Sequence, residues 1–244
     1  MTKTFLTAEW RKLIMAQYEV DPAILAPWLP PGVELDFYEV GDTRHCYISL
    51  IGFLFDQVRV KGISIPFHTS FEEVNLRFYV ARTEPDGTRK RGVVFIREFV
   101  PREEIALVAE LIYEEPYRAV AMDHSIHDTP HALFVSYRWG NRKSWQRMTV
   151  EAQPELKPIA PGSQEEFVTE HYWGYTKRKN GPTSEYEVQH PRWMVYPVNN
   201  FEIEVDFEAL YGSAFAALTH QRPASVLLAE GSAVSVSDGV RLTG

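Results

Sequence analysis

Polar and apolar residues alternate in the stretch Phe71-Glu72-Glu73-Val74-Asn75-Leu76-Arg77-Phe78-Tyr79-Val80. Successive side chains of a β-strand point to opposite faces, so this stretch predicts a strand with one apolar and one polar face. The apolar face carries Val74, Leu76, Phe78 and Val80, and the polar face carries Glu73, Asn75, Arg77 and Tyr79. Neighbours on one face lie roughly 7 Å apart. An acid, an amide, a base and a phenol in one row indicate the wall of a polar cavity.

The composition is that of an ordinary globular protein. Of the 244 residues, 45% are hydrophobic, 24% charged and 13% aromatic, which allows a sizeable core. We expect one domain that spans residues 1–244. The net charge of −8 disfavours nucleic-acid binding, because no basic stripe offsets the acidic total.

The single cysteine, Cys46, bears on the compartment. It can form no disulfide within the chain, which fits a reducing environment, and its apolar neighbours indicate a buried structural residue rather than a nucleophile. The N-terminal residues contain no apolar stretch of signal-peptide length, and no run approaches the roughly 18 apolar residues of a membrane helix. We therefore predict a cytoplasmic protein that does not enter the membrane.

Short strands separated by turns dominate the pattern along the chain. Turns with proline, asparagine or glycine are predicted at residues 84–87 and 178–181, and each joins two strands as a hairpin. Strands are predicted over residues 13–20, 33–40, 46–60, 72–81, 92–99, 117–122, 132–139, 146–152, 171–177, 184–190, 201–205, 225–230 and 233–236. This spacing is typical of a barrel or a sandwich.

Three short helices interrupt the strands. Asp21 caps the first, with Pro22 at its first helical position. The second is predicted over residues 101–113, because a proline and two glutamates favour a helix N-terminus. Ser163 and Glu166 form a capping box that opens the third.

Seven segments together carry a resemblance to a known family. They are Tyr18-Glu19-Val20-Asp21-Pro22, Leu29-Pro30-Pro31-Gly32-Val33, Glu73-Val74-Asn75-Leu76-Arg77-Phe78-Tyr79-Val80, Gly92-Val93-Val94-Phe95, Glu170-His171-Tyr172, His190-Pro191-Arg192-Trp193 and Ala229-Glu230-Gly231-Ser232. In this order they resemble the YqjF-like family of unknown function, in the acetoacetate decarboxylase-like barrel superfamily. The resemblance implies a mainly β (α+β) fold, a closed antiparallel β-barrel with a few short flanking helices and a central ligand cavity. It implies no settled activity.

The distant decarboxylase relatives use a lysine that forms a Schiff base, with its pKa lowered by an adjacent lysine. They also carry an arginine for the substrate carboxylate, and Arg11, seven residues before Tyr18, is similar in position. The lysine pair is missing, because no lysine lies between Lys90 and Lys143 and no two lysines are adjacent. The sequence therefore predicts neither Schiff-base chemistry nor a cofactor.

The polar row supplies the main candidates for a site. Glu73 is a candidate general base if burial raises its pKa, and Asn75, Arg77 and Tyr79 are candidates for ligand binding. The Arg77 guanidinium can fork a carboxylate or a phosphate. Arg11 is a further candidate for a ligand carboxylate. The alternatives are a solvated strand face or an internal ion-pair network for the row, and an exposed strand start for Arg11.

A second group of candidates flanks the predicted hairpin at residues 178–181. Tyr172 and His190 can approach each other across antiparallel strands, which makes Tyr172 a candidate ligand contact. Glu170 and His190 are a candidate acid–base couple. The alternative is that Tyr172 is a core aromatic and His190 only ends a strand.

A histidine-rich segment, residues 124–131, contains three imidazoles and a carboxylate. Such groups can bind zinc or iron, but the spacing matches no known metal signature. The flanking aspartates and Pro130 favour a surface loop between strands, so we predict no metal site.

Three functions remain open from the sequence. The first is a barrel that binds a small organic acid or another oxygen-rich metabolite. The second is a lyase or decarboxylase-like enzyme that uses Glu73, Glu170 or His190 instead of a Schiff base. The third is a non-catalytic homo-oligomer that associates through the apolar residues 51–55. Whether the protein is an enzyme is left undecided.

Overall fold

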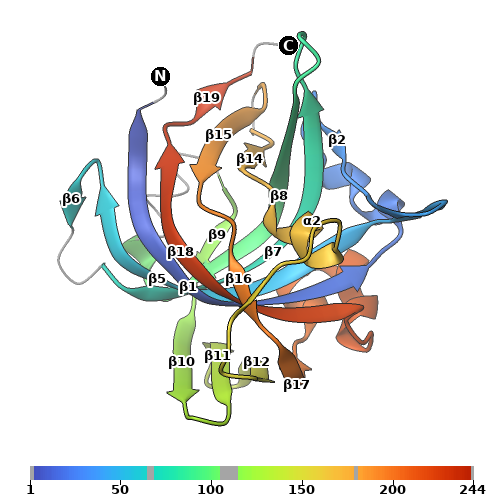
Figure 1. Ribbon diagram of the computed structural model, residues 1–244. Coiled ribbons are helices and arrows are strands. Elements are labelled where there is room, and N and C mark those ends of the chain that lie inside the picture. The colour runs from blue at the N-terminus through green and yellow to red at the C-terminus, as the bar shows by residue number, and fades with distance from the viewer. Residues whose placement is uncertain (1–2, 65–68, 105–114, 179–180, 243–244) are drawn as a thin grey trace.

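The computed structural model describes residues 3–64, 69–104, 115–178 and 181–242 (Figure 1). Seven strands within these residues close into a barrel, because β18 pairs with β1 on one side and with β15 on the other. In their order around the barrel they are β18 (Ser225–Ser237), β1 (Thr4–Glu19), β5 (Tyr47–Val60), β7 (Phe71–Thr83), β8 (Arg89–Val100), β14 (Trp173–Thr176) and β15 (Ser184–Gln189). The predicted closed barrel is confirmed.

The barrel is mixed rather than wholly antiparallel. Strand β14 runs parallel to β8, where Trp173 pairs with Gly92, whereas the other six pairings are antiparallel. The chain leaves β8 through a second sheet and returns before β14. A parallel pairing needs such a long crossover connection, so the deviation from the predicted antiparallel barrel follows from this excursion.

Short strands extend the barrel at its edges. Strand β2 pairs with β7, β6 with β5, β9 with β8, β16 with β18, β13 with β16 and β19 with β15, while β3 and β4 pair only with each other. Their bounds are β2 Glu34–Leu35, β3 Tyr38–Val40, β4 Thr43–His45, β6 Ile63–Ser64, β9 Tyr117–Ala119, β13 Lys157–Pro158, β16 Met194–Tyr196 and β19 Val240–Arg241.

The second sheet lies below the barrel in Figure 1. Its antiparallel strands are β10 (Ala121–Asp128), β11 (Leu133–Asn141), β12 (Ser144–Ala152) and β17 (Val198–Glu204). Tyr137 and Trp139 of this sheet are fully buried in one cluster with Leu50 and Leu76 of the barrel. The sheet therefore packs on the outer surface of the barrel and shields it from water.

The two faces of β7 lie in different environments, as the alternation predicts. Val74, Leu76 and Phe78 pack outward in the cluster shared with the second sheet. Phe71 and Tyr79 belong to a separate cluster inside the barrel. The strand is thus buried on both faces, and only its inner face is polar.

The helices are few and short. The predicted first helix is two 3₁₀ turns, η1 (Pro22–Ile24) and η2 (Ala26–Trp28), and the Asp21 side chain accepts from the Ala23 amide at 2.9 Å. The capping box is confirmed, because Ser163 Oγ accepts from the Glu166 amide at 3.1 Å at the start of α2 (Gln164–Thr169). Most of the predicted helix at residues 101–113 lies outside the described residues. Helix α3 (Phe207–Tyr211) and the 3₁₀ helix η3 (Ser213–Thr219) were not predicted.

Two further expectations concern surfaces. Within the described residues, no helix has the length and apolar character that crossing a membrane requires. The apolar residues 51–55 form no exposed patch, because Ile51, Phe53 and Phe55 point into the barrel and are at most 8% exposed. The apolar surface patch predicted for this segment is therefore not present, and self-association of the protein stays a prediction.

Candidate functional site

A cavity of about 340 Å³ lies inside the barrel, and all seven barrel strands contribute to its lining. One part of the wall is aromatic and consists of Trp10, Phe53, Phe55, Phe71 and Trp193. Trp10 packs edge-on against Phe53 at 5.3 Å and Trp193 at 6.3 Å between ring centroids, and Phe55 stacks on Phe71 at 4.9 Å. This wall suits the apolar body of a small molecule.

The polar part of the wall contains the row predicted from the sequence. Glu73, Asn75 and Arg77 all line the cavity, and the first two are only 3% and 2% exposed. Asn75 Nδ2 donates to Glu73 Oε1 at 2.9 Å, and Arg77 Nη2 donates to the Val168 carbonyl at 3.5 Å. The row thus faces inward, which rules out the alternative of a solvated strand face.

Two further buried carboxyls, which the sequence did not predict as site residues, join Glu73. Glu98 on β8 is the register partner of Asn75, and Glu115 lies just before β9. Both line the cavity and are at most 4% exposed. We call Glu73, Glu98 and Glu115 the acid cluster.

Two tyrosines hydrogen bond to the acid cluster. The Tyr117 hydroxyl donates to Glu73 Oε2 at 3.2 Å, and the Tyr186 hydroxyl donates to Glu115. Both tyrosines also line the cavity. These bonds orient two of the three carboxyl groups.

Burial makes the acid cluster hold protons near neutral pH. It raises the pKa of Glu73 to about 7, against hydrogen bonds from Asn75 and Tyr117 and the positive charge of Arg77. Burial raises the pKa of Glu115 to about 8. The pKa of Glu98 lies well above its usual range, because of burial and then the neighbouring charges of Glu115 and Glu73. Carboxyls that titrate near neutrality are typical of functional sites.

Five buried side-chain atoms of cavity-lining residues have no hydrogen-bond partner in the part of the chain that the structure describes. They are Nε of Arg77, Nε1 of Trp10, Oδ1 of Asn75, Oε2 of Glu98 and Nδ1 of His171. Buried polar groups are normally satisfied, so such atoms call for an explanation. A ligand that carries both acceptors and donors would satisfy the Arg77, Asn75 and Glu98 atoms.

Tyr79, the fourth residue of the predicted row, does not line the cavity. Its hydroxyl lies 2.5 Å from Ser49 Oγ and donates to Gln17 Oε1 at 3.3 Å. Its ring packs against Phe167 and His171 at centroid distances of 5.3 and 4.7 Å. Tyr79 therefore fills the barrel interior beyond the cavity rather than contacting a ligand there.

A buried ion pair that the sequence did not predict as part of the site lies beside Tyr79. His171 Nε2 donates to Asp36 Oδ2 at 3.0 Å, and Arg91 Nε donates to the same oxygen at 2.7 Å. Burial opposes the charged form of Asp36, but hydrogen bonds from His171 and Arg91 hold its pKa well below its usual range. Burial lowers the pKa of His171 to about 4, so its imidazole is neutral at neutral pH.

The second predicted group is only partly assembled. The Tyr172 and His190 rings lie 4.7 Å apart, and the Tyr172 hydroxyl donates to Glu170 Oε2 at 2.7 Å. His190 lines the cavity, stacks on Trp193 at 4.3 Å and donates from Nδ1 to the Pro191 carbonyl at 2.9 Å. Tyr172 thus stands between Glu170 and His190, and neither Glu170 nor Tyr172 lines the cavity.

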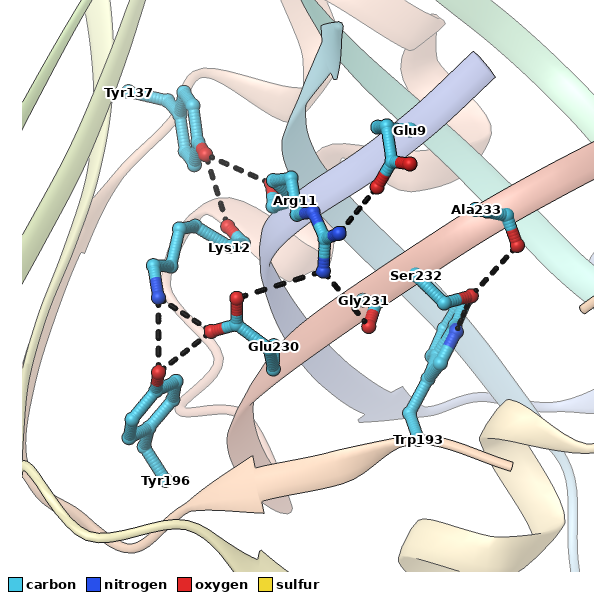
Figure 2. A network of polar contacts seen from close by, with 10 residues as sticks. All are labelled: Glu9, Arg11, Lys12, Tyr137, Trp193, Tyr196, Glu230, Gly231, Ser232 and Ala233. Atoms are coloured by element: carbon cyan, nitrogen blue, oxygen red, sulfur yellow. Dashed lines mark hydrogen bonds and ion pairs between the residues drawn. The ribbon is translucent and has the colours of Figure 1, made fainter. Parts of the chain in front are cut away.

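Arg11 does not line the cavity, and Figure 2 shows its guanidinium among Glu9, Glu230 and the Gly231 carbonyl. Its guanidinium pairs with Glu9 and lies 3.6 Å from Glu230, and it donates to the Gly231 carbonyl at 3.5 Å. The cause is a bulge at Lys12, where φ is 54° and the pairing of β1 with β5 slips. Arg11 and Lys12 consequently both face outward, and the predicted contact between Arg11 and a ligand in the barrel does not form.

The remaining candidates lie elsewhere. His124 and His127 belong to strand β10, so the predicted loop between strands is confirmed only for residues 129–132. His124 Nδ1 bonds with Glu72 Oε1 at 2.6 Å on the outside of the barrel. Within the described residues, no cluster of metal-ligating side chains is found. Burial raises the pKa of the Cys46 thiol to about 11, which fits a structural residue.

The closed barrel and its internal cavity define an acetoacetate decarboxylase-like barrel protein. Residues 7–233 match the DUF2071 family of uncharacterized conserved proteins, and the chain belongs to this family. The predicted acetoacetate decarboxylase-like fold is confirmed, while membership of that superfamily and the YqjF-like assignment stay predictions. No curated protein matches the sequence.

Solved structures share the fold at low sequence identity. An acetoacetate decarboxylase-like enzyme from Sphingomonas wittichii RW1 is 12% identical with a TM-score of 0.65, covering 99% of this chain and 94% of that one. Acetoacetate decarboxylase from Legionella pneumophila is 13% identical with a TM-score of 0.66, covering 98% and 87%. The enduracididine biosynthesis enzyme MppR complexed with pyruvate is 13% identical with a TM-score of 0.64, covering 100% and 91%. These likenesses concern the fold alone.

Proposed function

We propose that this protein binds a small organic acid in the barrel cavity, with the ligand carboxylate on Arg77. The observation that carries the proposal is the unpartnered Nε of Arg77, a buried donor on a cavity-lining side chain. A carboxylate accepts from a guanidinium in a forked geometry that few other anions match. The solved structure of MppR with pyruvate supports the idea that barrels of this fold accept such acids.

The chemistry of the site differs from that of a Schiff-base decarboxylase. The described residues that line the cavity include no lysine, so a bound keto acid meets carboxyls, tyrosines and one arginine instead. Borohydride trapping with keto acids should therefore give no stable lysine adduct.

One observation favours turnover as a second candidate function. Glu73 lies on the cavity wall with a pKa of about 7, and a general acid or base works best when its pKa is near the working pH. Glu73 then exchanges a proton with a ligand held by Arg77. If a ligand is turned over, Glu73→Gln should abolish turnover and retain binding.

A thermal-shift screen of organic acids tests the binding proposal. A ligand at 100 times its dissociation constant stabilises the fold by about 2.7 kcal/mol. Arg77→Ala should abolish the shift for a hit, whereas the control Arg138→Ala should not, because Arg138 is exposed on the second sheet and pairs with Asp123. The proposal fails if Arg77→Ala and the unaltered protein respond equally to every acid that binds.

A further inference from the structure

The geometry points to a second recognition subsite: the acid cluster receives a protonated nitrogen group, so that the ligand is an amino acid or guanidino acid with its carboxylate on Arg77. This inference rests on the proposed function and makes it more specific. It concerns the part of the cavity wall beside β7, where Glu98 and Glu115 were not predicted from the sequence.

The three carboxyls of the acid cluster converge from separate segments. Glu73 lies on β7, Glu98 on β8 and Glu115 before β9. Each is at least 96% buried, and all three line one cavity of about 340 Å³. Burying several carboxyls together costs free energy unless something compensates, so the arrangement indicates a purpose beyond packing.

The buried polar atoms that lack a hydrogen-bond partner within the described residues indicate which kind of ligand group offsets the buried carboxyls. Within the described residues, Glu98 Oε2 and Asn75 Oδ1 are buried without a hydrogen-bond partner, and they belong to register partners on neighbouring strands. An anion brings only acceptors, so it leaves Asn75 Oδ1 unsatisfied and can accept from Glu98 only while that carboxyl keeps its proton. An ammonium or guanidinium brings several donors together with a positive charge, and so satisfies both atoms.

The charges around the cavity agree with this assignment. Besides the acid cluster, the described titratable groups that line the cavity are Arg77, Tyr117, Tyr186, His171, His190 and Glu104, and burial keeps His171 neutral near pH 7. Arg77 is the one arginine or lysine among these described lining residues, against the three buried carboxyls and Glu104. Near neutral pH, protons compensate the excess of buried acid. A cationic nitrogen replaces them, so its binding releases protons to solvent.

The spacing along β7 sets the length of the ligand. Asn75 and Arg77 are neighbours on one face of the strand and lie roughly 7 Å apart. A chain of about five carbons between carboxylate and nitrogen spans this distance. Its methylene groups would lie against the aromatic wall that contains Phe71 and Phe53.

A matched pair of probes tests the inference. The probes are ε-aminocaproate and caproate, which differ only in the terminal amine. Isothermal titration calorimetry near neutral pH, in two buffers of different ionisation enthalpy, measures both affinity and proton release. We expect ε-aminocaproate to bind roughly tenfold or more tighter than caproate, and to release about one proton per ligand. Caproate should release none.

Variants assign the effect to the acid cluster. Glu98→Gln should reduce the affinity for ε-aminocaproate to that for caproate and leave caproate binding unchanged. The control Glu72→Gln should change neither, because Glu72 faces outward and bonds with His124. A loss of preference in Glu72→Gln equal to that in Glu98→Gln would count against the subsite.

The outcomes separate the two proposals. Equal binding of both probes, or no binding of ε-aminocaproate, would overturn the subsite. If both probes bind equally and Arg77→Ala abolishes both, the subsite is wrong and the organic-acid function stands. If Arg77→Ala leaves both affinities unchanged, the organic-acid function fails and the subsite inference fails with it.

Discussion

The imidazole of His171 donates a hydrogen bond to the carboxylate of Asp36 at 3.0 Å, although the two residues lie 135 positions apart in the chain. The His171 side chain is completely buried, and Arg89 and Arg91 of β8 also bind the Asp36 carboxylate. This contact joins the segment after β2 to the segment after α2, next to Tyr79 of β7. It anchors the strand that carries the polar row of the cavity.

The pair of Asp36 and His171 should make the fold sensitive to acid. His171 has a pKa of about 4 in the folded protein against about 6.5 when unfolded, so the unfolded state takes up a proton first as the pH falls. The stability is complete above about pH 6.5 and is lost as the pH falls toward 4, by roughly 3 kcal/mol. The lowered pKa of Asp36 adds a loss of the same sign at lower pH. Urea unfolding over this pH range measures the slope.

The variant His171→Phe provides the comparison for this slope. It removes the titrating imidazole. Between about pH 6.5 and 4, the slope of its unfolding free energy against pH should therefore correspond to about one proton fewer taken up on unfolding. His131 is exposed in a turn of the second sheet, and His131→Phe should keep the original slope. An unchanged slope in His171→Phe would show that this imidazole does not govern the acid sensitivity.

The contribution of the acid cluster to folding stability should depend on pH in the opposite direction to that of Asp36 and His171. Glu73 has a folded pKa of about 7 against about 4.5 unfolded, so its contribution is lost as the pH rises through that window. Glu73→Gln removes the cost of ionising a buried carboxyl, and should stabilise the protein by roughly 3 kcal/mol near pH 8. Near pH 4 the two proteins should be about equally stable.

Chemical unfolding of Glu73→Gln at both pH values checks this expectation. Glu72→Gln on the same strand is the control and should not stabilise, because it loses the bond with His124. Lower stability of Glu73→Gln near pH 8 would mean that the carboxylate is compensated within the protein. A gain in stability from removing a buried acid is typical of a residue kept for function.

Gly174 should be intolerant of a side chain. It pairs with Tyr186 across β14 and β15, and a Cβ at this position would collide with the Tyr186 ring, reaching within 2.5 Å of Cε1. Gly174→Ala must displace the ring and its bond to Glu115, with an expected loss of roughly 1–3 kcal/mol. Gly181→Ala in the same hairpin has no atom within 4 Å of its Cβ and should have little effect. Equal stability of the two variants by urea unfolding would contradict this packing.

The alternation in β7 was readable from the sequence because the side-chain period of a regular strand is two. It correctly separated Val74, Leu76 and Phe78 from Glu73 and Asn75. Turn chemistry at residues 84–87 and the cap at Ser163 were equally local and equally readable. These features depend on neighbours within a few positions, which the sequence displays directly.

Two bulges explain why other site residues were misjudged. The pairing of β7 with β8 slips at Arg77, which pairs with Phe95 while Leu76 pairs with Arg97. Phe95 and Glu98 therefore both line the cavity, whereas strict alternation would turn Arg97 inward. The bulge at Lys12 moves Arg11 outward in the same way. Beyond a bulge, each residue of the strand lies on the opposite face from the one that strict alternation predicts. No local sequence pattern indicated these two bulges.

Contacts between segments far apart in the chain explain why the remaining site residues were not predicted from the sequence. Glu115 precedes the second sheet and lies beside Glu98 because β9 pairs in parallel with β8. His171 reaches the cavity only because the chain leaves β8, builds the second sheet and returns in parallel at β14. Asp36 meets its partners in the same way. Such contacts depend on the crossover and the register of distant strands, and no spacing in the sequence specifies them.

The outward orientation of Arg11 allows a direct test of which arginine binds the ligand. Arg11 lies on the outside of the barrel, where Glu9, Glu230 and the Gly231 carbonyl already engage its guanidinium (Figure 2). Its side chain is 38% exposed, so the exposed ion pairs should be worth at most about 1 kcal/mol. The affinity of Arg11→Ala for any organic-acid ligand should therefore be within about twofold of that of the unaltered protein, a difference of less than about 1 kcal/mol in binding free energy.

The matched variant is Arg77→Ala, which should lose binding of the same acid. The unpartnered Nε of Arg77 belongs to a cavity-lining side chain, whereas Lys12 and Arg11 surround Glu230 on the far side of the strand. Calorimetric titration of both variants with one acid compares them directly. If Arg11→Ala loses binding and Arg77→Ala keeps it, the ligand carboxylate lies outside the barrel, at the bulge, and the cavity is not the site.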